Sequence, residues 1–176
     1  MNMTKSILVS TFILLCAVIL ESSILSNISF IYIVPDLVLI CSIYFSLLNG
    51  KVVGETTGFI SGILLDFITG IPFGFNCIYR TIFGYVYGIF AKNVIISGFI
   101  LPMLCVGIGT IAKTLMVHLL ALLFPNVNIY IAGIISYDFL FEFIENVLLA
   151  PFVFKFLSFF RKSLAVKSVK DAIDND

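Results

Sequence analysis

Ionisable side chains recur inside strongly apolar stretches of this sequence. Acidic, basic and imidazole groups in such places could form ion pairs, bind a polar ligand or transfer protons. A charge at the centre of a bilayer costs about 3 kcal/mol on insertion scales, so such residues normally face a helical bundle and pair with one another. Three kinds of chemistry are open to them: ion pairs within the bundle, a polar cavity or site for a partner's transmembrane helix, and a proton or substrate pathway. The residues are Glu55, Asp66, Arg80, Lys113, His118, Asp138, Glu142 and Glu145.

The spacing of the acidic residues places them on shared helix faces. Asp138, Glu142 and Glu145 follow the spacing i, i+4, i+7 and therefore lie on one face of a helix. Glu55 and Asp66 are eleven residues apart, which is about three helical turns, and are also expected to share a side. The pattern predicts carboxylates that point into a bundle and away from lipid.

Two basic residues, Arg80 and Lys113, lie in other apolar stretches, and we expect them to pair with these carboxylates across the bundle. His118 has no neighbour at metal-ligand spacing, so we expect it to be packed or hydrogen-bonded. The chain contains no HExxH, GxSxG or Walker pattern, and its four cysteines are far apart within apolar runs. We therefore expect no catalytic residue, no metal site and no cofactor.

A regular stripe of small residues is the sharpest local pattern in the chain. Residues in this stripe recur every four positions, which places them along one helix, and they are Gly54, Gly58, Gly62, Asp66 and Gly70. Glycines at this spacing let a second helix backbone approach closely, which is how helices associate in lipid. We interpret the stripe as a packing surface within the chain, with a docking face for another membrane subunit as the alternative.

The elements that must position these residues are membrane-spanning helices. Of the 176 residues, 61% are hydrophobic and 11% are charged, far from the quarter that is charged in soluble domains. A span needs about 20 apolar residues. The sequence predicts an all-α, polytopic helical bundle of about six transmembrane helices in residues 1–160, followed by a short cytoplasmic tail, 161–176. The expected helices cover 7–25, 33–48, 52–70, 74–91, 95–124 and 129–160.

Basic residues predict how this bundle is oriented. With six spans, one side holds every Lys and Arg of the short loops and termini, and the opposite loops, 26–32, 71–73 and 125–128, contain none. The basic side is cytoplasmic in such proteins. We therefore expect a multi-pass protein of the bacterial cytoplasmic (inner) membrane with both termini in the cytoplasm. The net charge of zero gives no indication of a nucleic-acid partner.

A combination of proline, glycine and aromatic motifs lies between residues 35 and 88. A helix that opens with proline leads through a Gly turn into G-x-x-x-G-F-x-x-G-x-x-x-D, then into a G-x-P-x-G-x-N turn and a helix with an aromatic-glycine ending. The residues are Pro35, Gly50, Gly54, Gly58, Phe59, Gly62, Asp66, Gly70, Pro72, Gly74, Asn76, Gly84, Tyr85 and Gly88. This combination resembles the MreD family of rod-shape-determining membrane proteins.

The resemblance implies a non-enzymatic subunit of the cell-elongation complex. MreD proteins are expected to work with a MreC-like protein, and through it with MreB, RodA and a penicillin-binding transpeptidase, in lateral peptidoglycan synthesis. The family is also similar to the substrate-binding S components of vitamin transporters, which are the alternative function. S components commonly carry an Ala-x-x-x-Ala motif on their first helix, whereas segment 7–25 offers only Ala17. An intramembrane enzyme is a third reading, without a recognisable nucleophile or metal set.

Overall fold

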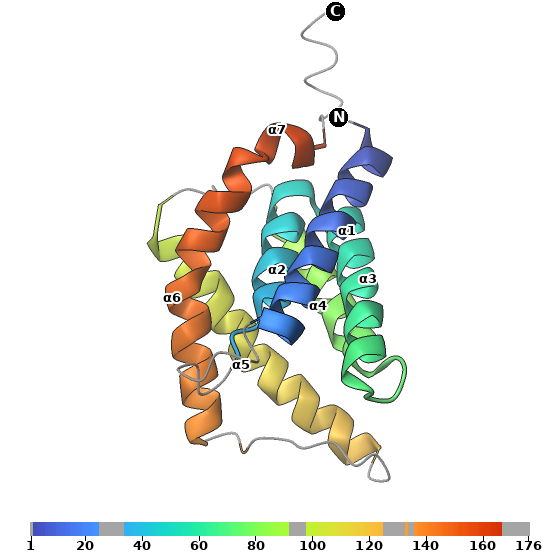
Figure 1. The fold of residues 1–176 in the computed structure, drawn as a ribbon, viewed down its shortest axis with the longest axis vertical. Helices are drawn as coiled ribbons and strands as arrows, with labels where there is room; N and C mark the ends of the chain where they lie inside the picture. Colours follow the sequence, from blue (N-terminus) through green and yellow to red (C-terminus); the bar gives the residue numbers. More distant parts are fainter. Residues whose placement is uncertain (1, 25–33, 92–97, 125–132, 134–135, 167–176) are drawn as a thin grey trace, which may run out of the picture.

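The computed structural model describes residues 2–24, 34–91, 98–124, 133 and 136–166, and within them it is a bundle of six long helices without a strand (Figure 1). This confirms the predicted all-α helical bundle. A π-helical turn, η1 (Leu20–Ile24), continues the first helix, and a short helix, α7 (Arg161–Leu164), follows the last. The long helices are α1 (Met3–Ile19), α2 (Leu37–Asn49), α3 (Lys51–Thr69), α4 (Phe75–Ile89), α5 (Ile100–Leu123) and α6 (Tyr137–Phe159).

Each of the six predicted segments contains one long helix, but α2, α5 and α6 begin several residues later than hydropathy suggested, with α5 starting at Ile100. Residues 34–36 are not helical, and α2 begins at Leu37 because Pro35 disfavours helix before it and Asp36 caps the helix. Likewise α6 begins at Tyr137, after Ser136, whose side chain accepts a hydrogen bond from the N–H of Phe139. The predicted residues 25, 33, 95–97, 129–132 and 134–135 lie outside the described part of the chain, as does most of the expected tail.

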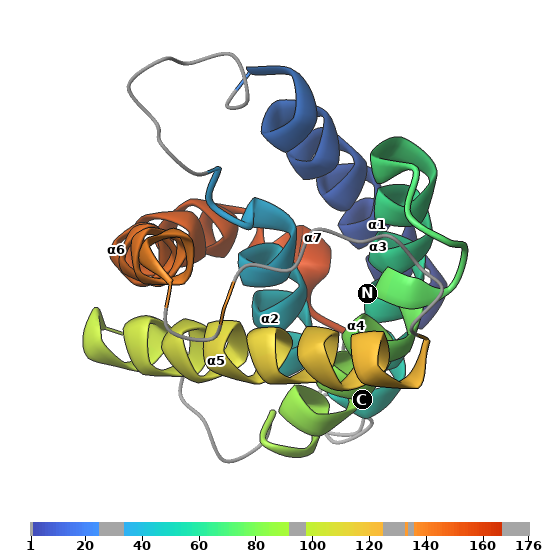
Figure 2. The ribbon, with the colours of Figure 1, turned by 90° about the horizontal axis from the view of Figure 1, so that it is seen from below.

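In the part of the chain that the structure describes, three helical segments are long and apolar enough to cross a membrane, namely Met3–Ser23, Lys51–Thr69 and Ile100–Leu123. The apolar helix α2 has only 13 residues, which is about 20 Å of helix and less than a bilayer core. Every residue from Val38 to Leu47 is buried, as expected for a helix that is apolar all round. The remaining helices surround α2, which lies in the middle of the bundle (Figure 2).

The most extensive contact between two helices joins α3 to α4, and the glycine stripe lies in it. A Cβ atom on Gly54, Gly58 or Gly62 would collide with the backbone of α4, and one on Gly84 or Gly88 would collide with that of α3. Backbones therefore touch along this pair, and α4 covers the stripe, so it is not open to another subunit.

Gly70 does not belong to this packed stripe, contrary to the sequence-based expectation. It ends α3 with a φ of +66°, and a Cβ added to it would meet nothing within 4 Å. Each step of four residues turns about 40° around a helix, so four steps bring the fifth position to the far side. Gly70 instead supplies the left-handed backbone that the turn needs.

The described ends of the chain meet at one end of the bundle, together with the turn between α2 and α3 (Figure 1). The hydroxyl of Ser6 donates to the carbonyl of Leu164, and the N–H of Val166 donates to Oδ1 of Asn49 at 2.9 Å. This end carries exposed basic side chains from α1, α3, α6 and α7, and we call it the basic end. They are Lys5, Lys51, Lys155 and Arg161.

Candidate functional site

Asp36 lies at the centre of the candidate site, at the N-terminus of the short central helix α2. Its side chain caps the helix, since Oδ1 accepts a hydrogen bond from the N–H of Leu39 at 2.7 Å. Only 3% of the residue is exposed. Because α2 is too short to reach both membrane surfaces, its first N–H groups lie inside the bundle, where no water is guaranteed to them. Polar side chains must therefore surround this helix end.

Two cations bind Asp36 from neighbouring helices. Nη2 of Arg80, on α4, lies 2.8 Å from Oδ2 and 3.0 Å from Oδ1 of Asp36. Nζ of Lys113, on α5, lies 2.8 Å from Oδ2 and also donates to Oε1 of Glu142 on α6 at 2.5 Å. We call Asp36, Arg80, Lys113 and Glu142 the charge cluster. Its two cations and two carboxylates balance, which is what a low-dielectric interior requires.

Neutral polar groups and one further carboxylate complete the surroundings of Asp36. Its backbone N–H donates to Oδ1 of Asn146 at 2.8 Å, and the amide of Asn146 donates to Oγ1 of Thr110 at 3.2 Å. From η1, Oε2 of Glu21 accepts the N–H of Val38 at 3.3 Å. Side chains from four neighbouring segments, η1, α4, α5 and α6, thus converge on the start of α2, and two carboxylates lie at the positive end of its dipole.

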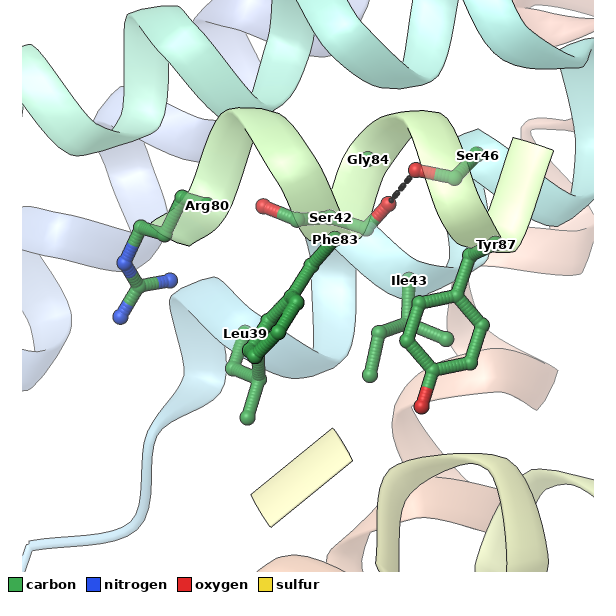
Figure 3. Close-up of a pocket in the computed structure, with 8 residues that line it drawn as sticks. All are labelled: Leu39, Ser42, Ile43, Ser46, Arg80, Phe83, Gly84 and Tyr87. Carbon is green, nitrogen blue, oxygen red and sulfur yellow. Dashed lines mark hydrogen bonds between the residues drawn. The ribbon is translucent and has the colours of Figure 1, made fainter. Parts of the chain in front are cut away.

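A small cavity borders Arg80 between α2 and α4 (Figure 3). Its volume is about 10 Å³, room for one water molecule and far too little for a vitamin. Within the described residues, Nε and Nη1 of Arg80 have no hydrogen-bond partner. Ser42 and Ser46 line the other side, and the Ser46 hydroxyl donates to the Ser42 carbonyl at 2.7 Å.

Asp66, near the end of α3, binds the turn that leads into α4. Its Oδ2 accepts from the N–H of Gly74 at 2.8 Å, and its Oδ1 accepts from the backbone and side-chain N–H groups of Asn76 at 2.9 and 2.8 Å. The hydroxyl of Tyr79 donates to the Asn76 amide oxygen at 2.7 Å. These backbone donors belong to the start of α4 and lack partners within it. Asp66 therefore acts as a remote cap and not as a member of an ion pair.

Removing this cap by Asp66→Ala is expected to lower the free energy of unfolding by about 2–3 kcal/mol, because buried donors then lose a charged acceptor. The measurement is thermal unfolding of the purified protein in mild detergent. Glu55→Ala is the matched control, since Glu55 is an exposed carboxylate on the same helix. If both variants unfolded at the wild-type temperature, the turn would not depend on Asp66.

Comparison with known proteins adds the family. A family model described as rod shape-determining protein MreD matches residues 1–160. The chain belongs to the MreD family. The match covers all six long helices, whereas the motifs seen in the sequence ended at residue 88. No curated protein and no solved structure shows a significant match.

In this MreD protein, some of the predicted polar residues form the expected ion pairs and others do not. Lys113 contacts Glu142, a pairing that the sequence indicated, but Arg80 pairs with Asp36 and with none of the carboxylates named for it. Glu55 is exposed, contrary to the prediction that it points into the bundle. Asp138 and Glu145 are half-buried.

His118 stays within its own helix, as expected, with Nδ1 2.8 Å from the carbonyl oxygen of Thr114. Sequence reasoning missed Asp36, Glu21 and Asn146 as parts of the site. The available signal was the Pro35-Asp36 pair, which opened the MreD-like motif and matched a helix cap.

Proposed function

We propose that this MreD protein is a non-enzymatic membrane subunit of the cell-elongation complex. It helps to assemble and regulate lateral peptidoglycan synthesis with a MreC-like protein, and through it with MreB, RodA and a penicillin-binding transpeptidase. The observation that carries the proposal is the family match across residues 1–160, which makes the chain a rod-shape-determining membrane protein.

The contacts of the buried carboxylates support a structural role. Asp36 and Glu142 bind Arg80 and Lys113, and Asp66 binds the start of α4. Each of these groups satisfies a charge or a backbone donor that the fold itself creates. A bundle that fixes its helices in this way offers partner helices a defined outer surface.

The proposed location is the bacterial cytoplasmic membrane, with both termini in the cytoplasm. The basic end supports this orientation, because it gathers exposed Lys and Arg side chains from four helices, and basic residues stay on the cytoplasmic side. Two further cations of the described residues, Arg80 and Lys113, are engaged in the charge cluster and do not mark a second surface.

Depletion of the protein in its host tests the proposal. We expect elongated cells to become round or swollen within a few generations, because side-wall synthesis loses a subunit, and we expect a MreC-like protein to co-purify with the wild-type chain. Microscopy gives the first readout and affinity purification from detergent extracts the second. Unchanged cell shape together with lost vitamin uptake would favour the S-component alternative and contradict the proposal.

A further inference from the structure

A cleft of about 410 Å³ lies at the basic end of the bundle, between the first turn of α5 and the last turns of α6. Figure 1 shows these two helix segments beside each other, below α7. The residues that form its floor and rim are Phe99, Pro102, Pro151, Phe154, Lys155 and Arg161. The cleft is separate from the charge cluster and takes no part in the function proposed above.

The cleft combines an apolar floor with a basic rim. Phe154 and Pro102 are buried, so they form a fixed wall, and Lys155 and Arg161 are exposed at the rim. Neither cation forms an ion pair with a carboxylate of the described residues, and no described carboxylate lines the cleft. Within the described residues the local charge is therefore positive, and it suits an anionic group.

The surroundings identify which anion fits. Exposed phenylalanines flank the cleft on α6, with Phe152 65%, Phe156 61% and Phe159 77% exposed, and Phe99 at the start of α5 is 60% exposed. In a membrane protein this surface contacts acyl chains and the headgroup boundary. Basic pockets between transmembrane helices on the cytoplasmic side bind lipid headgroups, and arginine pairs with phosphate in two parallel hydrogen bonds. A ligand with both a phosphate and acyl chains matches both halves of the cleft.

We propose that this cleft is a binding site for an anionic phospholipid. The phosphodiester headgroup contacts Lys155 and Arg161, and the acyl chains lie along the apolar surface of α5 and α6. The hydroxyl of Ser158, which also lines the cleft, donates to the carbonyl oxygen of Lys155 at 2.6 Å, so Lys155 and Arg161 supply the contacts to the anion. The lipid would fill the opening between the two helix ends at the basic end of the bundle.

Native mass spectrometry of the full chain in detergent tests this site with phosphatidylglycerol and phosphatidylcholine of identical acyl chains. We expect the wild type to retain phosphatidylglycerol at least ~10-fold more tightly, and Lys155→Gln/Arg161→Gln to lose roughly 30-fold, about five-fold for each basic residue. Lys5→Gln/Lys51→Gln is the matched control, because it removes the same charge from the same end outside the cleft. It should bind within about two-fold of the wild type.

Several results would overturn the site. Equal retention of phosphatidylglycerol and phosphatidylcholine by the wild type would contradict the site without any variant. An equal loss of phosphatidylglycerol affinity in the two double variants would also contradict it. Displacement of phosphatidylglycerol by millimolar inorganic phosphate would show a free-anion site in place of a lipid site. Both replaced side chains are exposed, so the variants should unfold at the wild-type temperature, and a thermal scan checks this.

Discussion

Asp36→Asn is expected to destabilise the bundle by about 3–5 kcal/mol, because it removes one member of a buried set of balanced charges. Among the described residues, the variant removes the carboxylate that pairs with Arg80 and leaves Lys113 paired with Glu142. It also removes the negative charge that lies at the positive end of the α2 dipole. Thermal unfolding in detergent, together with the yield of membrane-inserted protein, measures the effect.

A second substitution shows whether the loss of stability comes from the unbalanced charge or from the changed side chain itself. Asp36→Asn/Arg80→Gln leaves Lys113 and Glu142 as a balanced pair, so we expect the double variant to be more stable than Asp36→Asn. Glu55→Gln neutralises an exposed carboxylate and should change stability by no more than about 0.5 kcal/mol. Wild-type stability of Asp36→Asn would contradict a charge cluster that holds the helices together. So would a double variant that is no more stable than Asp36→Asn.

The charge cluster follows from the length of α2. A helix of 13 residues that is buried on every side must start within the bundle. Its first N–H groups have no partner within the helix and therefore need acceptors from elsewhere. Asp36 supplies one, and its charge then requires the cations that arrive from α4 and α5. The cluster therefore fixes the relative positions of the four helices α2, α4, α5 and α6, which a scaffold for other subunits needs.

The helices and their packing surface could be predicted because they depend on local pattern. Hydropathy reports the water-to-lipid transfer of a segment, so the six apolar runs were visible without knowledge of any contact. The four-residue spacing of Gly54, Gly58 and Gly62 likewise indicates a close helix partner, and the neighbouring α4 provides it.

The membership of the charge cluster could not be predicted because it depends on three-dimensional partners. Asp36 lies at the edge of an apolar run, where an acidic residue usually marks the boundary, and only the short length of α2 brings it inside. Glu55 and Asp66 share a side by spacing, yet Gly54 and Thr57 are buried beside the exposed Glu55. Spacing shows which residues share one side of a helix. Neighbouring helices cross at an angle, so the side of the helix that is packed changes along its length.

Gly58→Ala is expected to cost about 2–3 kcal/mol of stability, a large effect for one methyl group. The new Cβ would collide with the carbonyl oxygen of Arg80 and lie 2.9 Å from its carbonyl carbon. These are backbone atoms of a helix, so they cannot yield unless α3 and α4 separate. Because the obstructing residue is Arg80, separation also pulls its guanidinium from Asp36 and weakens the charge cluster. Thermal unfolding in detergent measures the loss.

Gly107→Ala is the matched control, because it makes the same change within a transmembrane helix. There the added Cβ would meet the ends of two side chains, Val147 at 3.3 Å and Phe143 at 3.4 Å, which can shift by a few tenths of an ångström. Alanine also favours the helix over glycine by about 1 kcal/mol, which offsets the crowding. We therefore expect Gly107→Ala to remain within about 1 kcal/mol of the wild type and to support rod shape in depleted cells, whereas Gly58→Ala fails to support it at raised temperature. Equal stability of the two variants would mean that α3 and α4 do not touch through their backbones.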